Sequence, residues 1–347
     1  MIDFLIVGGG LAGIAFAETA VQSGATVHMI SNSSATSSSA VAAGIYNPVI
    51  LKRFSGLNQA QHQLDVMNDF YHILESKLGR KYKHKVPVLR LFASIEEQNN
   101  WFAASDKMTL SAFLSTTLYR NHFDHISSPY DYGEVHQTGY LDVKELLIDY
   151  REYLLSEGFY SEDNFDYDLL KVKRDSVEYK NVEARHTIFA EGFGLINNPW
   201  FGNLPLDGTK GELLVINAPA LKVDKIINAG VFVLPVGRGV YKVGATYNWV
   251  DKDETPTKAG FEELMQRTKE VLECDFEVIE HLAGIRPTVK DRKPLLGTHH
   301  VHKNMHVFNG LGTRGVMLGP AMAKLLYNHI VKQEPLPREA DIKRFKI

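Results

Sequence analysis

The chain opens with a short apolar run that is followed directly by a cluster of glycines. Residues 2–7 are apolar except for Asp3, a pattern typical of a buried strand. Small and apolar residues then recur at helical spacing from Ile14 to Ser23, and a further apolar run covers residues 26–30. The pattern therefore predicts a strand, a glycine turn, a helix and a second strand at the start of the chain.

Amphipathic segments and short apolar runs alternate along the rest of the sequence. Apolar residues at steps of three and four predict one helix from Leu64 to Leu78 and another from Leu146 to Leu154. Asp142 and Glu145, just before the second of these, have the spacing of a capping box. Further helices are expected over residues 110–118, 259–273 and 316–331, and strands over 88–92, 169–172, 176–179, 186–190, 212–217, 231–236, 240–245 and 305–308.

The first glycine cluster has the spacing of a phosphate-binding turn. Gly8, Gly10 and Gly13 form a G-x-G-x-x-G motif that follows a predicted strand and opens a predicted helix. In such a turn the first glycine permits the tight bend, the second lets a pyrophosphate approach the backbone, and the third lets helix and strand pack closely. The free N–H groups at the helix start then face the diphosphate. The context predicts a dinucleotide site; the alternative is an ordinary glycine-rich turn.

The end of the second predicted strand departs from the usual dinucleotide pattern. Such sites normally place Asp or Glu there, where the carboxylate holds the ribose hydroxyls. In this chain the position is Ser31, and Asn32 follows it. Either side chain can form a hydrogen bond with a ribose hydroxyl, although without the strength that a charge adds.

A second glycine-rich junction lies about 300 residues after the first. The predicted strand at 305–308 leads into Gly310, Gly312 and Gly315, and the helix expected from Val316 follows at once, with Pro320 in its first turns, where proline is tolerated. The start of this helix is again the positive end of a fixed dipole.

Composition narrows the classes of protein and of partner. The chain has 347 residues, 44% of them hydrophobic, which allows two domains or one large one. The net charge of -3 gives no reason to expect nucleic acid as a partner. Cys274 is the single cysteine, which excludes an internal disulfide and fits a reducing compartment. Because no signal peptide or membrane-length apolar stretch is seen, a soluble cytoplasmic protein is expected. The histidines show no metal-binding spacing.

Taken together, these motifs resemble the family of D-amino-acid oxidases, glycine oxidases, sarcosine oxidases and related amine dehydrogenases, the DAO flavoproteins. The similarity is spread along the whole chain and is closest to glycine-oxidase-type members, in which an Ala-Gly-Ile-Arg-Pro segment such as residues 283–287 recurs. The matching segments are Gly8/Gly10/Gly13, 38–48, 139–143, 187–192, 210–214, 233–235 with 243–246, 283–297 and 310–320.

The resemblance implies an α/β fold with two interleaved domains. An FAD-binding Rossmann-like domain of the glutathione-reductase type is expected from residues 1–50, 139–200 and 281–347. A substrate domain, a mixed β-sheet plus helices, is expected from residues 51–138 and 201–280. The FAD is expected to be non-covalent, because Cys274 lies upstream of the Arg-Pro segment, where it is interpreted as buried and structural.

The resemblance also implies a set of cofactor contacts. The diphosphate is expected over Gly8, Gly10, Leu11, Ala12 and Gly13, with Ala190, Glu191 and Gly192 on its other side. The remaining contacts are Ser31 and Asn32 at the ribose, Val172 at the adenine, Ser38, Ser39, Ala42, Ala43 and Gly44 along the flavin, and Gly312, Thr313, Arg314, Gly315 and Val316 at the N1/C2=O edge of the flavin ring.

Arg286 is the principal candidate on the substrate side. By resemblance its guanidinium would hold a substrate carboxylate at two points; the alternative is a structural ion pair with a nearby acid. Two positions depart from the family pattern: Phe232 stands where a substrate-facing Tyr is common, and Arg314 where a small or uncharged residue is usual, so that Arg314 either covers the ring or contacts an anionic group of its own. Tyr247 and Tyr46 are candidate pocket residues, with packing as an equal alternative.

The function implied by the resemblance is that of an FAD-dependent oxidoreductase. It would oxidise the C–N bond of an amino acid or related secondary amine by hydride transfer to flavin N5, and pass electrons to oxygen or another acceptor. One alternative resembles the flavin domain of MnmC, which acts on a carboxymethylaminomethyl-modified tRNA base and needs a basic surface; the tail residues Lys343, Arg344 and Lys346 are too few to decide. Another is a non-catalytic flavin-binding redox sensor, with Arg286 paired internally and the pocket filled.

Overall fold

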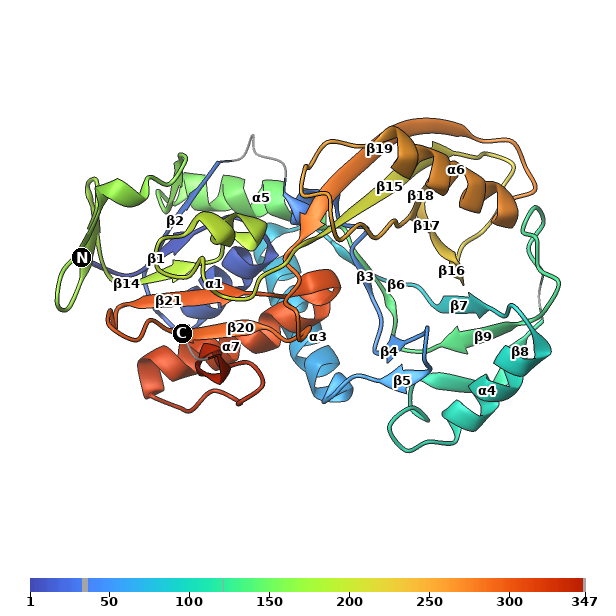
Figure 1. Ribbon diagram of the computed structural model, residues 1–347, viewed down its shortest axis with the longest axis horizontal. Coiled ribbons are helices and arrows are strands. Elements are labelled where there is room, and N and C mark those ends of the chain that lie inside the picture. The colour runs from blue at the N-terminus through green and yellow to red at the C-terminus, as the bar shows by residue number, and fades with distance from the viewer. Residues whose placement is uncertain (33–36, 121, 346–347) are drawn as a thin grey trace.

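A computed structural model describes residues 1–32, 37–120 and 122–345. The described chain is built around two eight-stranded sheets, which form two lobes side by side (Figure 1). Both ends of the chain lie in the first lobe (Figure 1). Residues 33–36 and the tail residue Lys346 lie outside the described residues.

The first sheet has a parallel centre of the kind that dinucleotide-binding folds use. β1 pairs in parallel with β2 and β14, and β14 pairs in parallel with β21. Its strands are β1 (Ile2–Val7), β2 (Val27–Ser31), β11 (Tyr160–Glu162), β12 (Leu170–Val172), β13 (Val177–Tyr179), β14 (Val182–Phe189), β20 (Leu295–Thr298) and β21 (Met305–Asn309).

The helices of this lobe are held together by a buried charge. Glu18 of α1 is fully buried; it accepts hydrogen bonds from Lys77 Nζ of α3 at 2.6 and 2.7 Å and from the Tyr150 hydroxyl of α5 at 3.2 Å. A buried charge needs such partners, so this cluster joins three helices. The bounds are α1 (Leu11–Gln22), α3 (Ala60–Leu78), α5 (Val143–Ser156) and α7 (Gly315–Lys332), and α7 packs against both α1 and α3.

The second sheet is mostly antiparallel, in the order β19-β15-β18-β17-β16-β7-β9-β8. Its longest pair, β15 with β19, ends at the first lobe (Figure 1). The strands are β7 (Val88–Leu91), β8 (Leu114–Tyr119), β9 (Tyr132–Val135), β15 (Thr209–Asn217), β16 (Ile226–Ala229), β17 (Val231–Gly237), β18 (Val240–Gly244) and β19 (Glu277–Arg286), with the helices α4 (Ile95–Ser105) and α6 (Lys258–Val271).

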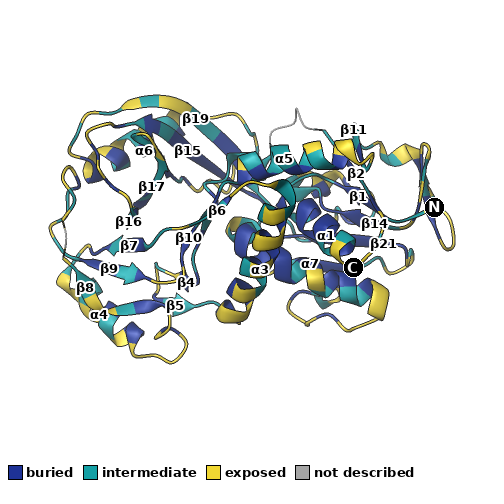
Figure 2. Ribbon diagram, turned by 180° about the vertical axis from the view of Figure 1, so that it is seen from behind, coloured by how far each residue is buried: buried dark blue, intermediate teal, exposed yellow. Residues whose placement is uncertain are grey.

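Short elements join the lobes. β10 pairs on either side with β3 and β6, and Figure 1 shows β3 and β6 between the lobes. In Figure 2 buried positions gather on the sheets and on the inner faces of the helices, as amphipathic patterning requires. The short elements are α2 (Ser38–Val41), β3 (Ile45–Tyr46), β4 (Val49–Ile50), β5 (Ser55–Gly56), β6 (Lys83–Lys85), β10 (Gly139–Leu141) and four 3₁₀ turns at Tyr167–Leu169, Gly192–Asn197, Gly312–Arg314 and Ile342–Arg344.

Most predicted elements are confirmed to within a few residues, but the helix predicted over 110–118 is wrong. Turns occupy its first part, and β8 then pairs with β9. The β-branched Thr116 and Thr117 favour the strand, whereas the spacing of Leu110, Phe113 and Leu114 arises from a buried turn. Such spacing cannot by itself distinguish a turn from a helix.

The capping box predicted before α5 is also wrong. Asp142 does stand at the N-cap position, but its side chain accepts no capping hydrogen bond. Glu145 instead forms an ion pair with Arg80 at 2.8 Å.

Two findings bear on membranes and metals. In the part of the chain that the structure describes, no helix combines the length and apolar character needed to cross a membrane. Within the same residues, no three His, Cys, Asp or Glu side chains gather in a way that could hold a metal ion.

Candidate active site

A cavity of about 1790 Å³ is lined by residues from both lobes. Drug-sized ligands occupy pockets of about 300–1000 Å³, so this cavity has room for an extended dinucleotide together with a small molecule. Its walls include the ends of β1, β2 and β19, the segment from Ser37 to Ile45, and the starts of α1 and α7.

The first glycine turn needs its glycines for close backbone approaches. Gly8 has a φ of +109°, and a Cβ there would lie 2.4 Å from the carbonyl oxygen of Ala190. A Cβ on Gly13 would lie 1.9 Å from the carbonyl oxygen of Gly8, so Gly13 serves the packing of α1 on β1 and does not line the cavity. Gly10 is the N-cap of α1 and has no capping side chain. The turn is thus a bare backbone cradle that fits a diphosphate.

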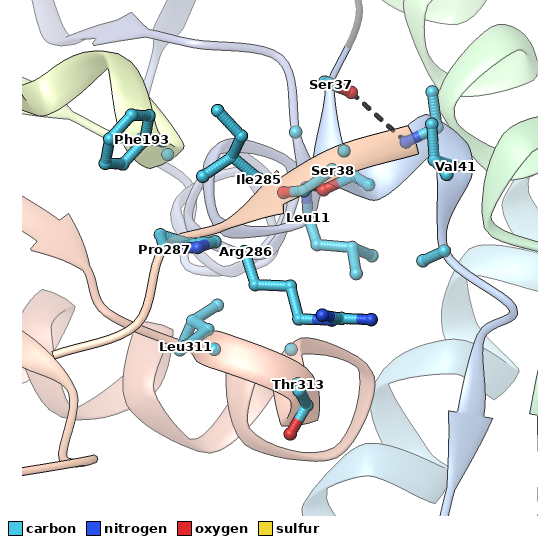
Figure 3. Close-up of a pocket in the computed structure, with 18 of the residues that line it drawn as sticks. Leu11, Ser37, Ser38, Val41, Phe193, Ile285, Arg286, Pro287, Leu311 and Thr313 are labelled. Atoms are coloured by element: carbon cyan, nitrogen blue, oxygen red, sulfur yellow. Dashed lines mark hydrogen bonds between the residues drawn. The ribbon is translucent and has the colours of Figure 1, made fainter. Parts of the chain in front are cut away.

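The second glycine junction brings another helix start to the same cavity. α7 begins at Gly315, where a Cβ would lie 3.3 Å from Cδ1 of Leu11 at the start of α1. Figure 3 shows Leu11, Leu311 and Thr313 around one space. Two helix N-termini, each the positive end of a dipole, therefore face a shared region that suits an anionic ligand.

The small-residue segment after β2 forms a tight wall. Ser37 caps α2 by accepting a hydrogen bond from the Ala40 N–H at 3.2 Å, and the Ser39 hydroxyl accepts one from the Leu11 N–H at 3.2 Å (Figure 3 shows the first). A Cβ on Gly44, which has a φ of +78°, would lie 1.9 Å from the carbonyl oxygen of Leu141. Small side chains here leave room for a flat, bulky ligand.

Arg286 ends β19 and reaches into the space between α2 and α7 (Figure 3). Its Nη1 donates to the Thr246 carbonyl at 3.3 Å, and its guanidinium lies 4.6 Å from the centre of the Tyr247 ring. A Cβ on Gly211 would lie 1.9 Å from its Nη2, so only glycine leaves room for this position. Burial lowers the pKa of Arg286, and the Tyr247 hydroxyl opposes this.

No carboxylate among the described residues lies within 4 Å of the Arg286 guanidinium. The carbonyl and the ring that it contacts do not neutralise its charge. A half-buried guanidinium that faces a cavity in this state is a site for an anion, and a carboxylate matches its fork-shaped donors.

Lys210 holds in place a loop that lines the cavity with Tyr247 and Trp249. This side chain is fully buried; its Nζ forms an ion pair with Asp251 at 2.6 Å and donates to the Thr255 carbonyl at 2.7 Å. The loop carries Tyr247 and Trp249, which line the cavity although they are 62% and 42% exposed. Lys210 was missed at the sequence level, because a lysine in a strand is ordinarily solvent-exposed.

Two further arginines stand near the start of α7. The half-buried Arg314 lines the cavity, and its Nη2 donates to the Arg292 carbonyl at 3.5 Å. Burial, and then the neighbouring charge of Arg292, lower the pKa of Arg314. No carboxylate among the described residues pairs with Arg314, so the cavity holds a second guanidinium without a countercharge. Phe232 of β17 lines the same cavity.

Ser31 and Asn32 do reach the cavity at the end of β2. The Ser31 carbonyl accepts a hydrogen bond from the Tyr160 hydroxyl at 2.9 Å, and Asn32 Nδ2 donates to Asn164 Oδ1 at 2.9 Å. Arg151 of α5 lines this end as well.

Glu191 lines the cavity, but both oxygens of its carboxylate accept hydrogen bonds from other side chains of the protein. The Tyr167 hydroxyl donates to Oε1 at 2.5 Å, and Asn198 Nδ2 donates to Oε2 at 2.8 Å. Burial raises the pKa of Glu191, while these two hydrogen bonds act to lower it. Its side chain therefore helps to hold the turn after β14.

The structure brings most of the predicted site residues to this cavity. Gly13, Val172 and Tyr46 do not line it. Tyr46 is buried, its hydroxyl donates to the His84 carbonyl at 3.4 Å, and burial raises its pKa to about 12, so packing explains it. The predicted residues that line the cavity are Gly8, Gly10, Leu11, Ala12, Ser31, Asn32, Ser38, Ser39, Ala42, Ala43, Gly44, Ala190, Glu191, Gly192, Tyr247, Arg286, Gly312, Thr313, Arg314, Gly315 and Val316.

Several lining residues were not among the predicted site residues, although Gly211 lies in one of the segments that match the family (210–214). Lys144 and Arg151 lie on α5, Phe165 follows β11, and Gly211 lies under Arg286. Cys274 is half-buried rather than buried as predicted, because it lies just past the end of α6, and it does not line the cavity.

The sequence matches the model of one protein family, described as "DAO: FAD dependent oxidoreductase", over residues 3–328. Glycine oxidase of Bacillus subtilis (strain 168) is 29% identical over 161 residues, 44% of this chain and 43% of that protein. The bifunctional tRNA 5-methylaminomethyl-2-thiouridine biosynthesis protein MnmC of Azoarcus sp. (strain BH72) is 25% identical over 190 residues, 49% of this chain and 30% of that protein. The aligned part thus spans less than half of either relative.

Solved structures show the same fold over nearly the whole chain. Iminodiacetate oxidase from Chelativorans sp. BNC1 superposes with a TM-score of 0.78 at 18% sequence identity, covering 97% of each chain.

Proposed function

This chain belongs to the DAO family of FAD-dependent oxidoreductases, and we propose that it oxidises the C–N bond of an amino acid or related secondary amine. The observation that carries the proposal is Arg286, whose half-buried guanidinium faces the cavity without a countercharge among the described residues. In that position it matches the carboxylate that such substrates carry.

The residues of the cavity fit non-covalent FAD. The backbone cradle at Gly8 and Gly10 suits the diphosphate, the small-residue wall from Ser38 to Gly44 suits the flat ring, and the start of α7 suits its electron-rich edge. When bound, FAD supplies a ring that accepts a hydride from the substrate carbon next to nitrogen and passes the electrons on to oxygen or another acceptor.

The protein contributes orientation and a dry site. Arg286 fixes the carboxylate at two points, so the substrate has little freedom to rotate within the cavity. Phe232 and Leu311 form apolar walls, which limit the access of water to the reacting carbon. The substrate amine is taken up neutral, so no protein base is needed to free its electron pair.

We propose that two sets of chain segments have different roles. Residues 1–50, 139–200 and 281–347 bind FAD, and residues 51–138 and 201–280 shape the substrate side. Strand β19 crosses the boundary at residue 281 and carries Arg286 from the second sheet to the cofactor cavity.

An anaerobic titration tests the proposal. The purified protein is mixed with glycine, both enantiomers of alanine and proline, sarcosine and iminodiacetate, and the visible flavin band is recorded. Bleaching by one of these amines supports the proposal and names the substrate class. A yellow protein that none of them bleaches counts against a small amine and favours the redox sensor or a larger substrate. A colourless protein that takes up no added FAD overturns the cofactor assignment.

A second candidate substrate is an amine carried on a tRNA base, as for MnmC. A separate cavity of about 560 Å³ is lined by Lys81, Lys85, Lys222 and Arg238, and among the described residues of its lining Asp224 is the one acid. Clusters of this kind bind phosphate backbones. A gel-shift titration with bulk tRNA decides: binding that weakens with salt and in Lys85→Gln/Arg238→Gln supports this candidate, and no shift at low salt removes it.

A further inference from the structure

The ribose end of the cofactor cavity has an unusual charge. A dinucleotide site normally places a carboxylate at the end of the second strand, but here the residue is Ser31. The nearby Asp163 lines the cavity, yet Lys180 forms an ion pair with it. Glu162 of β11 lies opposite Ser31 in the sheet but does not line the cavity. Of the described carboxylates next to the end of β2, Asp163 is therefore the one that lines the cavity, and it is paired with Lys180.

Helix α5 contributes two cations to the wall of the cavity, and Arg151 is the one close to Tyr160 and Ser31. Lys144, Leu147, Ile148 and Arg151 all line it, and their spacing of three, four and seven residues places them on one face of the helix. The face is apolar in the middle and positive at both ends, which suits a flat base with anionic groups beside it.

Arg151 lacks partners in a place where a partner is expected. Its Nε is buried and has no hydrogen-bond partner, and no carboxylate among the described residues forms an ion pair with it. An unsatisfied buried donor destabilises a protein, and a charged one does so more strongly, so such a group in a cavity wall indicates that a ligand completes it. The Tyr160 hydroxyl, which binds the Ser31 carbonyl, lies within the electrostatic reach of Arg151.

We propose that Arg151 takes the place of the missing acidic ribose ligand, and that this end of the cavity therefore accepts an adenosine ribose that carries a 2′-phosphate. The inference rests on the proposed binding of FAD. A carboxylate accepts hydrogen bonds from both ribose hydroxyls and repels a phosphate, whereas a guanidinium donates to ribose oxygens and attracts a phosphate. The change from acid to arginine thus reverses the charge preference at the ribose.

The test compares NAD⁺ and NADP⁺, which differ only in the 2′-phosphate. The whole chain is freed of FAD, its integrity is checked by rebinding FAD, and dissociation constants for FAD, NAD⁺ and NADP⁺ are measured by calorimetry. The variants are Arg151→Gln, Arg151→Lys and Ser31→Glu. Arg174→Gln is the charge-matched control, since Arg174 is exposed and does not line the cavity.

We expect the unmodified protein to bind NADP⁺ at least as tightly as NAD⁺. Arg151→Gln should lower the affinity for NADP⁺ about tenfold or more and the affinity for NAD⁺ much less, because a charge-assisted hydrogen bond to the 2′-phosphate is lost. Arg151→Lys should keep part of the preference for NADP⁺ over NAD⁺, and Ser31→Glu should reverse it. Arg174→Gln should leave all three dissociation constants unchanged.

Two results overturn the inference: a preference for NAD⁺ in the unmodified protein, or equal affinities of unmodified protein and Arg151→Gln for NADP⁺ and FAD. Failure of the proposed function looks different: if FAD is not the cofactor, it does not rebind to the unmodified chain, and if FAD binds but no amine is oxidised, the flavin band stays unbleached while the affinities for NAD⁺ and NADP⁺ can still be measured. Circular dichroism of Arg151→Gln without ligand shows whether this variant is folded. If it is not folded, the ratio of the NAD⁺ to the NADP⁺ dissociation constant in Arg151→Lys and Ser31→Glu decides.

Discussion

At the scale of single residues, the position of Arg286 depends on the absence of a side chain beneath it. Replacing Arg286 by Ala should lower kcat/KM for the amino-acid substrate by about 100-fold or more, since truncating one partner of a buried charge pair costs about 2–5 kcal/mol. Arg286→Lys should keep only part of kcat/KM, because the lysine ammonium cannot bind a carboxylate at two points as the guanidinium does. Steady-state kinetics with the flavin spectrum as a check on cofactor content measure this. Full turnover by Arg286→Ala would remove the carboxylate role.

Gly211 offers an independent check of the same geometry. A Cβ there would lie 1.9 Å from Nη2 of Arg286, so Gly211→Ala should displace the guanidinium and raise KM although no charge is lost. Gly230→Ala is not a fair control because Gly230 has a φ of +79°. Gly319→Ala is suitable, because a Cβ there would lie an ordinary 3.6 Å from its nearest neighbour and Gly319 does not line the cavity. Equal KM values in Gly211→Ala and the unmodified enzyme would contradict the position described for Arg286.

Arg314 leads to a prediction about which amine binds. Its guanidinium lines the cavity and has no carboxylate partner among the described residues. If it binds a second anionic group of the substrate, Arg314→Gln should raise KM for a dicarboxylic amine such as iminodiacetate at least tenfold more than KM for glycine. A parallel change for both amines would show instead that Arg314 acts on the cofactor side.

At the scale of elements, the loop that lines the cavity with Tyr247 and Trp249 depends on one buried ion pair. Lys210→Met should free Asp251 and the Thr255 carbonyl, raise KM several-fold and speed proteolysis within the loop, while lowering the free energy of unfolding by about 1–3 kcal/mol. Limited proteolysis and thermal unfolding measure both effects. Lys258→Met is the matched control, because Lys258 is 90% exposed and its ion pair is longer, at 3.7 Å. Unchanged cleavage in Lys210→Met would count against this role.

At the scale of the whole molecule, a buried histidine links stability to pH. His306 of β21 is buried; its ring accepts or donates hydrogen bonds to His186 of β14 at 3.1 Å and Thr298 of β20 at 2.9 Å. Burial, followed by the charges of His186 and His329, holds the pKa of His306 well below its ordinary value. The native state therefore keeps this ring neutral.

The sign of the pH effect follows from that pKa. Above about pH 6.5 both native and unfolded chains hold neutral His306, and its contribution to stability is complete. As the pH falls below this value the unfolded state binds the proton first, and stability falls by up to about 1.4 kcal/mol per pH unit. Thermal midpoints between pH 7.5 and 5 should therefore fall less steeply in His306→Gln than in the unmodified protein. His122→Gln, at an exposed site, should keep the steep fall.

Local motifs made much of the cofactor side predictable. The spacing of Gly8, Gly10 and Gly13 specifies a turn, and the close approach of Gly13 to the Gly8 carbonyl lies within the motif, whereas the approach of Gly8 to Ala190 comes from the neighbouring strand. Arg286 was predicted from its Arg-Pro context. The prediction of a helix over residues 110–118 was wrong, because a buried turn and a helix share the same apolar spacing there.

The sequence by itself determined the strand–turn–helix start, the resemblance to DAO flavoproteins and the candidate Arg286, because each rests on short motifs that can be recognised one at a time along the chain. Tertiary structure alone decided that Gly211 lies beneath Arg286, that Lys210 is buried under the loop, and that Arg151 lines the cavity from α5. These pairs are brought together by strands and helices distant in sequence, and burial changes what their charges do. No pattern along the chain records which distant groups will share a low-dielectric cavity.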